Sequence, residues 1–285
     1  MIAELINGKK IAEEIKSNIK KQILDLKSKY NIVPNIVTIK IGHDPSSELY
    51  LKLRDKACND VGVQSSHIDL NEKVSEKEVI NKINILNENN KVHGILVQYP
   101  VPNHISQYNL MSSIDPIKDV EGFNPVNMGN ILIGNEEIVP CTPLAVLKII
   151  EHEKINLKGK EIVIINHSNV VGKPLATLLL NRNATVTICH VFTKDVKSHS
   201  KNADILITAT GIPGLVNKDF VKNNSFVIDV GISKTNKGIS GDVDIESVKN
   251  ITKKITPVPG GVGPVTIACS LQNMIKVFLN TLEYK

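Results

Sequence analysis

Two side chains in the segment SELYLKLRDKAC could bind a polar ligand. Tyr50 and Arg54 are four residues apart, so a helix places an aromatic ring and a cation on one face. Lys52 and Lys56 lie roughly 200 degrees round the same helix from Arg54, and we expect them to face elsewhere. The alternative interpretation is that Tyr50 and Arg54 form an ordinary surface pair.

Further polar side chains stand at strand and loop ends in the same half of the chain. Gln98 ends the predicted strand HGILVQ, and the loop KDVEGFNP places Asp119 and Glu121 just before a glycine. An aromatic ring, a cation, an amide and carboxylates at such positions are typical of a polar substrate cleft.

The second half contains a candidate phosphate-binding turn. The predicted strand EIVII is followed by Asn166, His167 and Ser168, and then by a predicted helix that starts around Gly172. Unpaired N–H groups and the dipole at a helix N-terminus bind phosphate. The turn has fewer glycines than the usual dinucleotide fingerprint, so a plain strand-to-helix turn is the alternative.

Two more strand ends contain glycine. TATG (208–211) and DVG (229–231) end successive predicted strands, and a doubly wound sheet places its ligand loops at such ends. Each glycine taken alone could simply end a strand. Together they predict that several strand ends converge on one crevice.

These side chains need a framework of alternating strands and helices. Apolar residues repeat at helical spacing from Ile11 to Leu26. The apolar runs of the second half are typical of a parallel sheet covered on both faces. The predicted strands are 35–42, 65–70, 93–98, 161–165, 184–190, 203–210 and 225–231, and the later predicted helices are 46–61, 75–87, 144–151 and 265–282.

The expected fold class is α/β with two domains. A chain of 285 residues has room for two domains at roughly 150 residues each. The first would hold residues 1–140 together with the C-terminal helix, residues 264–285, packed back on it. The second, residues 141–263, would be a dinucleotide-binding domain, and a cleft between the two is the expected ligand site.

The composition limits the classes of molecule that we expect the protein to bind. Apolar residues make up 41% and charged residues 22%, with a mean hydropathy of -0.03, as in a soluble globular protein. A net charge of +5 without a basic run, 4% aromatic residues and no Trp favour an anionic small molecule over nucleic acid. The apolar stretches are far shorter than the ~20 residues of a membrane helix. Four widely spaced cysteines predict reduced thiols in the cytoplasm, and the scattered histidines predict no metal site.

Eight short motifs follow one another along the chain: IGHDPSSELYLKLRDKAC, GILVQYPVP, KDVEGFNPVNMG, PCTP, NVVGKP, DVGI, GDVD and TPVPGGVGP. In this order they resemble the FolD-type methylenetetrahydrofolate dehydrogenase/methenyltetrahydrofolate cyclohydrolases over essentially the whole chain. The resemblance implies a folate-binding domain and a Rossmann-type domain, usually in a homodimer. It implies oxidation of 5,10-methylenetetrahydrofolate with NADP, NAD being the other candidate, and hydrolysis of the methenyl product to 10-formyltetrahydrofolate.

The resemblance also implies the site residues. Tyr50 would stack on the folate, Gln98 would lie beside the catalytic position that Arg54 occupies, and Glu121 would hold the pterin. The implied substrate-binding set further includes Pro100, Asp119, Gly260, Gly261 and Pro264. The implied cofactor-binding set is Thr142, Asn166, His167, Ser168, Gly172, Val191, Thr210, Gly211, Gly231 and Ile232. No metal, nucleic acid or membrane partner is implied.

Two departures from the family fall in the implied folate site. Arg54 stands where the family has its catalytic lysine, and an arginine, with a pKa above about 12, stays charged and cannot serve as a base. We therefore expect hydride transfer to survive and water activation to fail. Glu121 stands in place of an aspartate, one methylene longer, which predicts weaker folate binding or a compensating backbone movement.

Two further departures fall in the implied cofactor site. Asn166, His167 and Ser168 replace Gly-Arg-Ser, and Val191 replaces a phosphate-contacting serine. We expect Asn166 to tolerate a left-handed backbone. Loss of the arginine weakens the contact with the 2′-phosphate of NADP, which Lys173 or Lys194 could partly restore, and no acidic residue indicates NAD.

The departures leave two alternatives open. One is a dehydrogenase without cyclohydrolase activity. The other is a folate-binding regulatory paralogue with little or no turnover.

Overall fold

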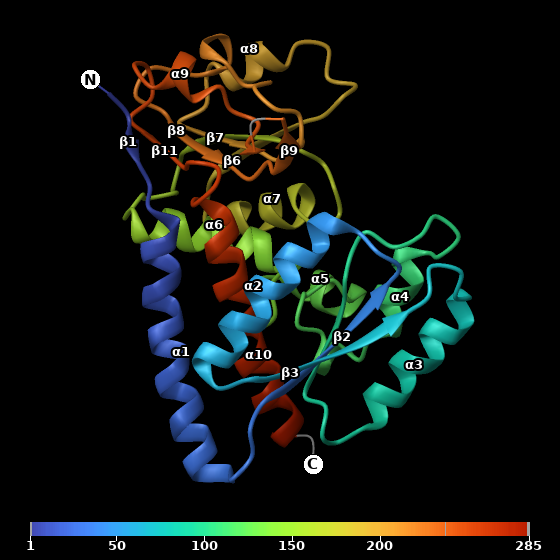
Figure 1. Cartoon of the computed structure of the whole chain (residues 1–285). Helices are drawn as coiled ribbons and strands as arrows, with labels where there is room; N and C mark the ends of the chain where they lie inside the picture. Colours follow the sequence, from blue (N-terminus) through green and yellow to red (C-terminus); the bar gives the residue numbers. More distant parts are fainter. Residues whose placement is uncertain (1, 237, 284–285) are drawn as a thin grey trace. The chain divides into compact units, whose positions relative to one another are not determined.

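The computed structural model describes residues 2–236 and 238–283, with the side chains of residues 45–47 left out. The chain forms two compact units (Figure 1). The six-stranded unit consists of Met1–Ala12 and Thr142–Thr266, and the three-stranded unit consists of Glu13–Cys141 and Ile267–Lys285. Each is an α/β unit, as the sequence predicted.

The three-stranded unit contains a parallel sheet with strand order β3-β2-β4. Its central strand is buried along most of its length because NIVTIKI is largely β-branched and apolar. Ser75 begins α3 with a capping box, in which Ser75 and Glu78 satisfy each other's backbone N–H groups. The elements are α1 (Gly8–Tyr30), β2 (Asn35–Ile41), α2 (Pro45–Val61), β3 (Gln64–Leu70), α3 (Glu76–Glu88), β4 (Gly94–Val97), α4 (Gln107–Ser113), the 3-10 helix η1 (Pro116–Lys118), α5 (Pro125–Leu132) and α10 (Val262–Glu283).

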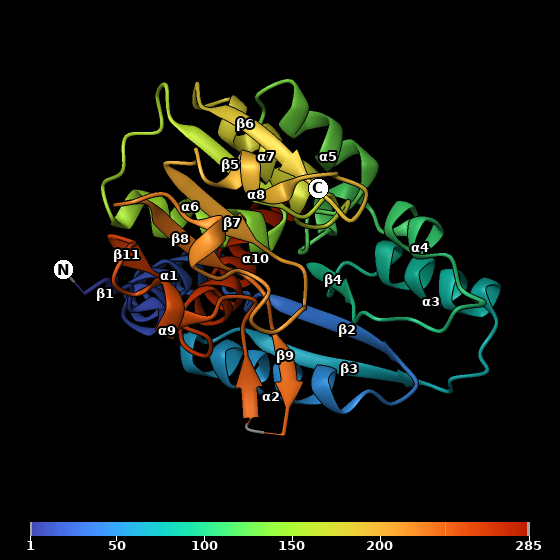
Figure 2. The same cartoon turned by 90° about the horizontal axis from the view of Figure 1, so that it is seen from above.

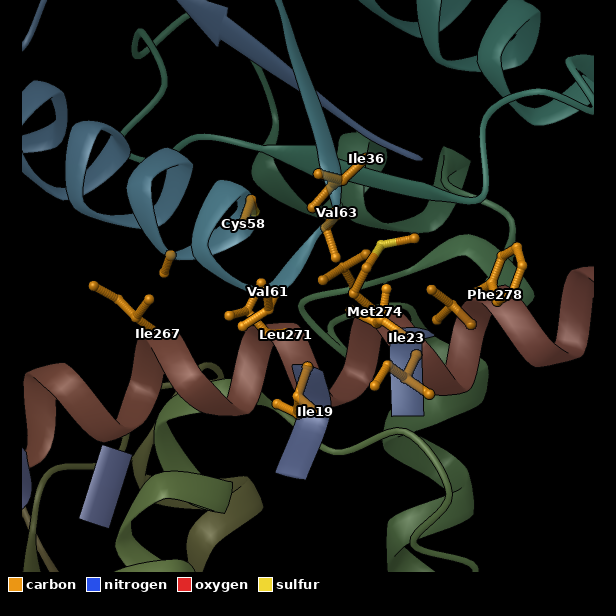
Figure 3. Close-up of a cluster of buried hydrophobic side chains, with 14 of the residues drawn as sticks. Ile19, Ile23, Ile36, Cys58, Val61, Val63, Ile267, Leu271, Met274 and Phe278 are labelled. Atoms are coloured by element: carbon orange, nitrogen blue, oxygen red, sulfur yellow. The ribbon is translucent and has the colours of Figure 1, made fainter. Parts of the chain in front are cut away.

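The C-terminal helix α10 supplies one side of the core of this unit. Figure 3 shows Ile267, Leu271, Met274 and Phe278 of α10 among side chains from α1 and α2. The prediction that this helix packs back on the first half of the chain is confirmed. Among the described helices, α10 has the length and hydropathy to cross a membrane, but 72% of its apolar window is buried in the protein. We interpret it as a core helix.

The six-stranded unit contains a sheet of order β1-β11-β8-β7-β5-β6 in which every pair is parallel, which confirms the predicted Rossmann-type sheet. Figure 2 shows β5, β6, β7 and β8 side by side. The elements are β1 (Glu4–Leu5), α6 (Cys141–His152), β5 (Glu161–Ile165), α7 (Gly172–Leu180), β6 (Thr185–Cys189), α8 (Val196–Ser200), β7 (Ile205–Thr208), η2 (Lys218–Phe220), β8 (Phe226–Asp229), β9 (Ser233–Thr235), β10 (Gly238–Ser240), α9 (Ile245–Val248) and β11 (Lys254–Ile255).

The register of this sheet aligns its carboxyl ends. Ile165 lies opposite both Cys189 and Thr208, and Thr208 lies opposite Asp229. The loops that follow β5, β6, β7 and β8 therefore leave the same edge of the sheet. The predicted convergence of these strand ends is confirmed.

The division differs from the expected boundaries at the N-terminus. Residues 1–12 belong to the six-stranded unit, whereas the sequence placed them with the first domain. The physical reason is that β1 pairs with β11 and Ala3 packs in the core of the six-stranded unit. A strand of two residues is too short to produce a periodic pattern.

Two helices begin three residues earlier than predicted. The helix α6 begins at Cys141 rather than Leu144, and α10 begins at Val262 rather than Val265. A Pro in the first turn of each helix costs no hydrogen bond, because the first N–H groups of a helix have no partner within it. The antiparallel hairpin of β9 and β10 was not predicted.

Candidate active site and cofactor site

Arg54 is the buried cation of the three-stranded unit. It lies on α2 with 1% of its surface exposed, whereas Lys52 and Lys56 are exposed as expected. Arg54 Nη2 donates to Thr38 Oγ1 at 2.9 Å, and its Cζ lies 5.9 Å from the centroid of the Tyr50 ring. The alternative of an ordinary surface pair is therefore wrong.

Two donors of Arg54 remain available for a ligand. Nε and Nη1 are buried and make no hydrogen bond to any residue that the structure describes. A buried donor without a partner costs about 1 to 3 kcal/mol, and more when it is charged. Arg54 is therefore placed to donate to an acceptor, which could be an ordered water or a substrate atom. Its unmatched donors do not stabilise the fold.

Thr38 is a site residue that the sequence reasoning missed. It lies fully buried in the middle of β2 and accepts the hydrogen bond that orients Arg54. The available signal was a single hydroxyl within the otherwise apolar core of NIVTIKI. Only the pairing of β2 with its neighbours makes that hydroxyl face α2.

The loop that carries Glu121 is held by Asp119. The Asp119 carboxylate accepts from Gly122 N at 3.0 Å, Asn124 N at 2.7 Å and Asn127 Nδ2 at 3.0 Å. Gly122 has φ +75 and its Cα faces the backbone of Val139, so a side chain would not fit there. Asp119 is thus engaged within its own loop, and the folate contact expected of it stays a prediction.

Glu121 lies half-buried beside Tyr50, Arg54 and Cys141. Burial raises its pKa from 4.5 to about 7, while the Arg54 cation lowers it and the neighbouring Asp119 raises it. Burial, and next the charge of Glu121, raise the pKa of the Tyr50 hydroxyl. The cluster therefore combines a permanent cation with a carboxyl that changes charge near neutral pH.

Asn273 of α10 ties the backbone around this cluster to the core. Its Nδ2 donates to the carbonyl of Val120 at 2.9 Å and to that of Val139 at 2.8 Å. Asn273 is fully buried in an apolar helix, and the sequence reasoning did not single it out. It fixes the segments that precede Glu121 and Cys141.

Gln98 and Pro100 follow β4 in the same unit. Gln98 Nε2 donates to the carbonyl of Tyr99 at 2.9 Å, and its Oε1 is buried without a partner among the described residues. The Tyr99–Pro100 peptide bond is cis, and Pro100 is exposed. Gln98 thus offers a third unmatched polar atom beside the two of Arg54, in this case an acceptor.

The turn after β5 is organised by the Asn166 side chain. Asn166 Oδ1 accepts from Ser168 N and Ser168 Oγ, both at 2.8 Å, and from Gly172 N at 3.0 Å, while its Nδ2 donates to the Ala209 carbonyl at 2.7 Å. Asn166 is not among the described residues with positive φ. The left-handed backbone that an asparagine tolerates is therefore not needed here, because the amide stabilises the turn through its side chain.

Gly172 begins α7 against this turn. A Cβ at position 172 would lie 2.1 Å from the carbonyl oxygen of Asn166, so only glycine permits the approach. The helix thus begins directly at the end of β5, which is the geometry that brings a pyrophosphate to a helix N-terminus. The turn fits a dinucleotide despite its single glycine.

The loops after β7 and β8 are joined by two buried aspartates. Asp242 Oδ2 accepts from Thr208 Oγ1 at 2.8 Å and from Thr210 N at 2.5 Å. Asp229 Oδ1 accepts from Gly231 N at 2.9 Å and from Asp242 N at 3.1 Å. Burial raises the pKa of Asp229 to about 6, in spite of these backbone donors. Asp242, which the sequence reasoning passed over, therefore positions Thr210 and Gly211.

His167 and Val191 stand at the ends of β5 and β6. Val191 and its neighbour Phe192 are each 82% exposed. The His167 ring lies 4.7 Å from that of His190, which lies 6.0 Å from that of Phe192. Gly211, which follows β7, and Ile232, which follows β8, are exposed as well.

The remaining predicted residues also lie in the six-stranded unit. Thr142 is the second residue of α6, and Gly260 and Gly261 directly precede α10, which contains Pro264 in its first turn. Gly261 is buried, and the other three are half-buried. Their contacts with folate or cofactor stay predictions. In the part of the chain that the structure describes, no three His, Cys, Asp or Glu side chains are grouped as metal ligands.

Two family descriptions match this sequence. Residues 6–121 match "Tetrahydrofolate dehydrogenase/cyclohydrolase, catalytic domain", and residues 140–282 match "Tetrahydrofolate dehydrogenase/cyclohydrolase, NAD(P)-binding domain". The bifunctional protein FolD of Pelagibacter ubique is 48% identical over 274 residues, covering 96% of this chain and 98% of its own length.

Solved structures agree with these matches. The bifunctional enzyme FolD of Campylobacter jejuni is 44% identical with a TM-score of 0.95, covering 98% of this chain and 99% of its own. The methylenetetrahydrofolate dehydrogenase-cyclohydrolase of Trypanosoma brucei, solved with NADP cofactor and an inhibitor, is 33% identical with a TM-score of 0.95 and covers 99% of each chain.

Proposed function

This chain belongs to the tetrahydrofolate dehydrogenase/cyclohydrolase family, and from that premise we propose that it oxidises 5,10-methylenetetrahydrofolate with NADP and hydrolyses the methenyl product to 10-formyltetrahydrofolate. The observation that carries the proposal is the buried cluster of Tyr50, Arg54 and Glu121. Its half-buried aromatic ring, fixed cation and carboxyl of raised pKa have the chemistry that a pterin and its one-carbon bridge require.

Each residue of the cluster has a separate role in the proposal. The Tyr50 ring provides a face on which the folate stacks. The ionised Glu121 carboxylate accepts from the N–H groups of the pterin, and it stabilises the positive charge that the oxidised methenyl bridge carries. Gln98 Oε1 supplies a further acceptor.

Arg54 cannot exchange a proton during the reaction. A guanidinium, with a pKa above about 12, stays charged near neutral pH, so its contribution is to orient and to polarise. Water that attacks the methenyl carbon must lose a proton. The nearby group that changes charge close to pH 7 is Glu121, and we assign the proton to it.

The cofactor would be held by the strand-end loops of the six-stranded unit. Asn166, Ser168 and Gly172 form the turn that would face the pyrophosphate, and Thr210 and Gly231 belong to the adjoining loops. When bound, NADP supplies the acceptor for the hydride. The chain's own contribution is to orient the cofactor and to limit its freedom before transfer.

One observation favours a narrower function. Arg54 at the position of the family's lysine would leave a dehydrogenase without hydrolase activity if Glu121 does not accept the proton.

We also propose a homodimer, which rests on the family resemblance alone. A cytoplasmic location is supported by four buried, free cysteines.

The test is a paired assay on one preparation. Oxidation of methylenetetrahydrofolate is followed with NADP and then with NAD, beside hydrolysis of methenyltetrahydrofolate corrected for its spontaneous rate. We expect both activities. Oxidation alone would establish the narrower function, and the absence of both would overturn the proposal in favour of a folate-binding protein without turnover.

A further inference from the structure

Arginine is rare in this chain. Of its 34 lysines and arginines, only Arg54 and Arg182 are arginines. Lys118, in the same unit as Arg54, shows how the fold uses an ammonium: its single nitrogen donates to three backbone carbonyls at the C-terminal end of α3. The protons of that ammonium are thus matched by the fold. The guanidinium of Arg54 has three nitrogens, and one of them is matched among the described residues.

Thr38 is the partner of that one nitrogen, and it stands among apolar side chains. It lies on the same face of β2 as Ile36, which belongs to one core cluster with Cys58 and Val61 of α2. A valine has nearly the same shape and would suit this apolar face without any hydrogen bond. The buried hydroxyl therefore costs free energy unless Arg54 donates to it. The guanidinium, rather than the packing, explains the hydroxyl.

We propose that Thr38 is a positioning residue for the folate site: it holds Nη2 of Arg54 and thereby directs Nε and Nη1 toward the bound substrate. This inference rests on the proposed function, since it concerns how Arg54 acts in the same reaction. A guanidinium is a planar fork whose donors point in fixed directions. With one end attached to α2 and one nitrogen held, the directions of the other two nitrogens are set. An ammonium is a compact point charge and needs no such hold.

The hydrogen bond matters because it orders the donors before the substrate arrives. Ordering them in advance removes a cost that binding would otherwise carry. A displacement of about 1 Å in a reacting site can lower the rate about a hundredfold. Without the Thr38 oxygen, the guanidinium would turn toward the Glu121 carboxylate, whose pKa the Arg54 cation lowers. Both groups would then be engaged with each other instead of with the substrate.

Thr38→Val and Thr38→Ser test the hydroxyl itself. We expect Thr38→Val to lower kcat/KM for methylenetetrahydrofolate oxidation about tenfold with KM for NADP unchanged, and Thr38→Ser to stay within about twofold of the wild type. Thr281→Val is the matched control, because Thr281 is a buried threonine of α10 in the same unit whose Oγ1 donates to the Phe278 carbonyl at 2.7 Å. A loss in Thr38→Val no larger than in Thr281→Val overturns the inference, as does an equal loss in Thr38→Ser.

A second background separates positioning from packing. In Arg54→Lys the cation no longer needs a direction, so adding Thr38→Val should cost less than about threefold in oxidation. A packing defect would instead cost about tenfold in both backgrounds, because the two changes would then act independently. That result overturns the inference. Urea unfolding of the same preparations checks that every variant is folded.

Nuclear magnetic resonance observes the hydrogen bond without turnover. Because the chain has two arginines, protein made with isotope-labelled arginine gives signals from two guanidinium groups, and Arg182→Lys assigns them. We expect separate, slowly exchanging Nη signals for Arg54 in the wild type and faster exchange in Thr38→Val. Equal exchange in the two proteins overturns the inference. Slow exchange in a wild-type chain that does not oxidise methylenetetrahydrofolate would instead count against the proposed function.

Discussion

The Arg54 cluster and the strand-end loops of the six-stranded unit differ in how far their side chains are shielded from water. Arg54 and its hydrogen-bond partner Thr38 are buried, and each unmatched polar atom around them is costly. The strand-end loops expose Val191 and Phe192, and the turn at Asn166 is built from local hydrogen bonds. Burial shifts the pKa values of the groups in a cluster by excluding water. An exposed loop can instead discriminate between ligands only through the side chains and backbone groups that contact them.

This contrast explains why departures from the family pattern differ in consequence. A change at Arg54 or Glu121 alters groups whose charges act in a low dielectric, where they are weakly screened. The asparagine at position 166 is accommodated because its side chain supplies the hydrogen bonds of the turn.

The largest effect is expected for Glu121→Gln. The variant keeps the shape of the side chain and removes both the negative charge and the proton acceptor. We expect kcat/KM for oxidation and for hydrolysis to fall about a hundredfold or more. Glu137→Gln, at an exposed position of the same unit, serves as the control. A loss no greater than that of the control would place Glu121 outside the site.

Asp242→Ala is expected to have the next largest effect, in the other unit. It removes the acceptor of Thr208 Oγ1 and Thr210 N, so the loop after β7 loses its tie to the loop after β8. We expect KM for NADP to rise about tenfold, with hydrolysis of methenyltetrahydrofolate changed less than about twofold.

Asp242→Asn distinguishes positioning from charge, because its amide oxygen can still accept from both donors. It should restore most of the affinity for NADP. Equal damage to oxidation and hydrolysis in Asp242→Ala would mean a general loss of folding instead. Urea unfolding of the same preparations measures that contribution.

Arg54→Lys is expected to increase one activity selectively. A lysine in a buried site can release its proton, so it adds the proton relay that arginine lacks. We expect hydrolysis to rise about tenfold and oxidation to change less than about threefold. No gain in hydrolysis would show that Arg54 does not limit that step.

The smallest effect is the pH dependence of oxidation. The Glu121 carboxyl, with a pKa raised to about 7 by burial, must be ionised to stabilise the methenyl cation. The rate should therefore fall about threefold or more between pH about 8 and about 6. A flat profile over that range would contradict the assigned charge.

The free energy of unfolding should depend on pH in the opposite direction to the oxidation rate, through the same Glu121 carboxyl. Because the pKa of Glu121 in the folded chain exceeds its ordinary value of 4.5, the protonated form stabilises the fold. That contribution is present in full below pH about 4.5 and is lost as the pH rises through about 7. Glu121→Gln should raise the free energy of unfolding above pH about 7, by on the order of 1 to 2 kcal/mol.

Much of the fold follows from patterns that are local in the chain. Apolar runs predicted the parallel strands β5 to β8, and helical spacing predicted α1, α2, α3 and α10. The pairing of β1 with β11 could not be predicted, since it joins Leu5 to Ile255 across most of the chain. Local patterns carry no information about a partner that distant.

The features of the candidate site likewise fall into those that the sequence predicted and those that only the tertiary structure shows. Residue types and spacing by themselves determined that Tyr50 and Arg54 share a helix face, and that several glycine-containing strand ends meet at one edge. Only the tertiary structure decided that Arg54 is buried, that Thr38 and Asn273 hold its surroundings, and that His167 meets His190. The reason is that periodicity is set by neighbours along the chain. Desolvation and the meeting of distant side chains depend on how the elements pack.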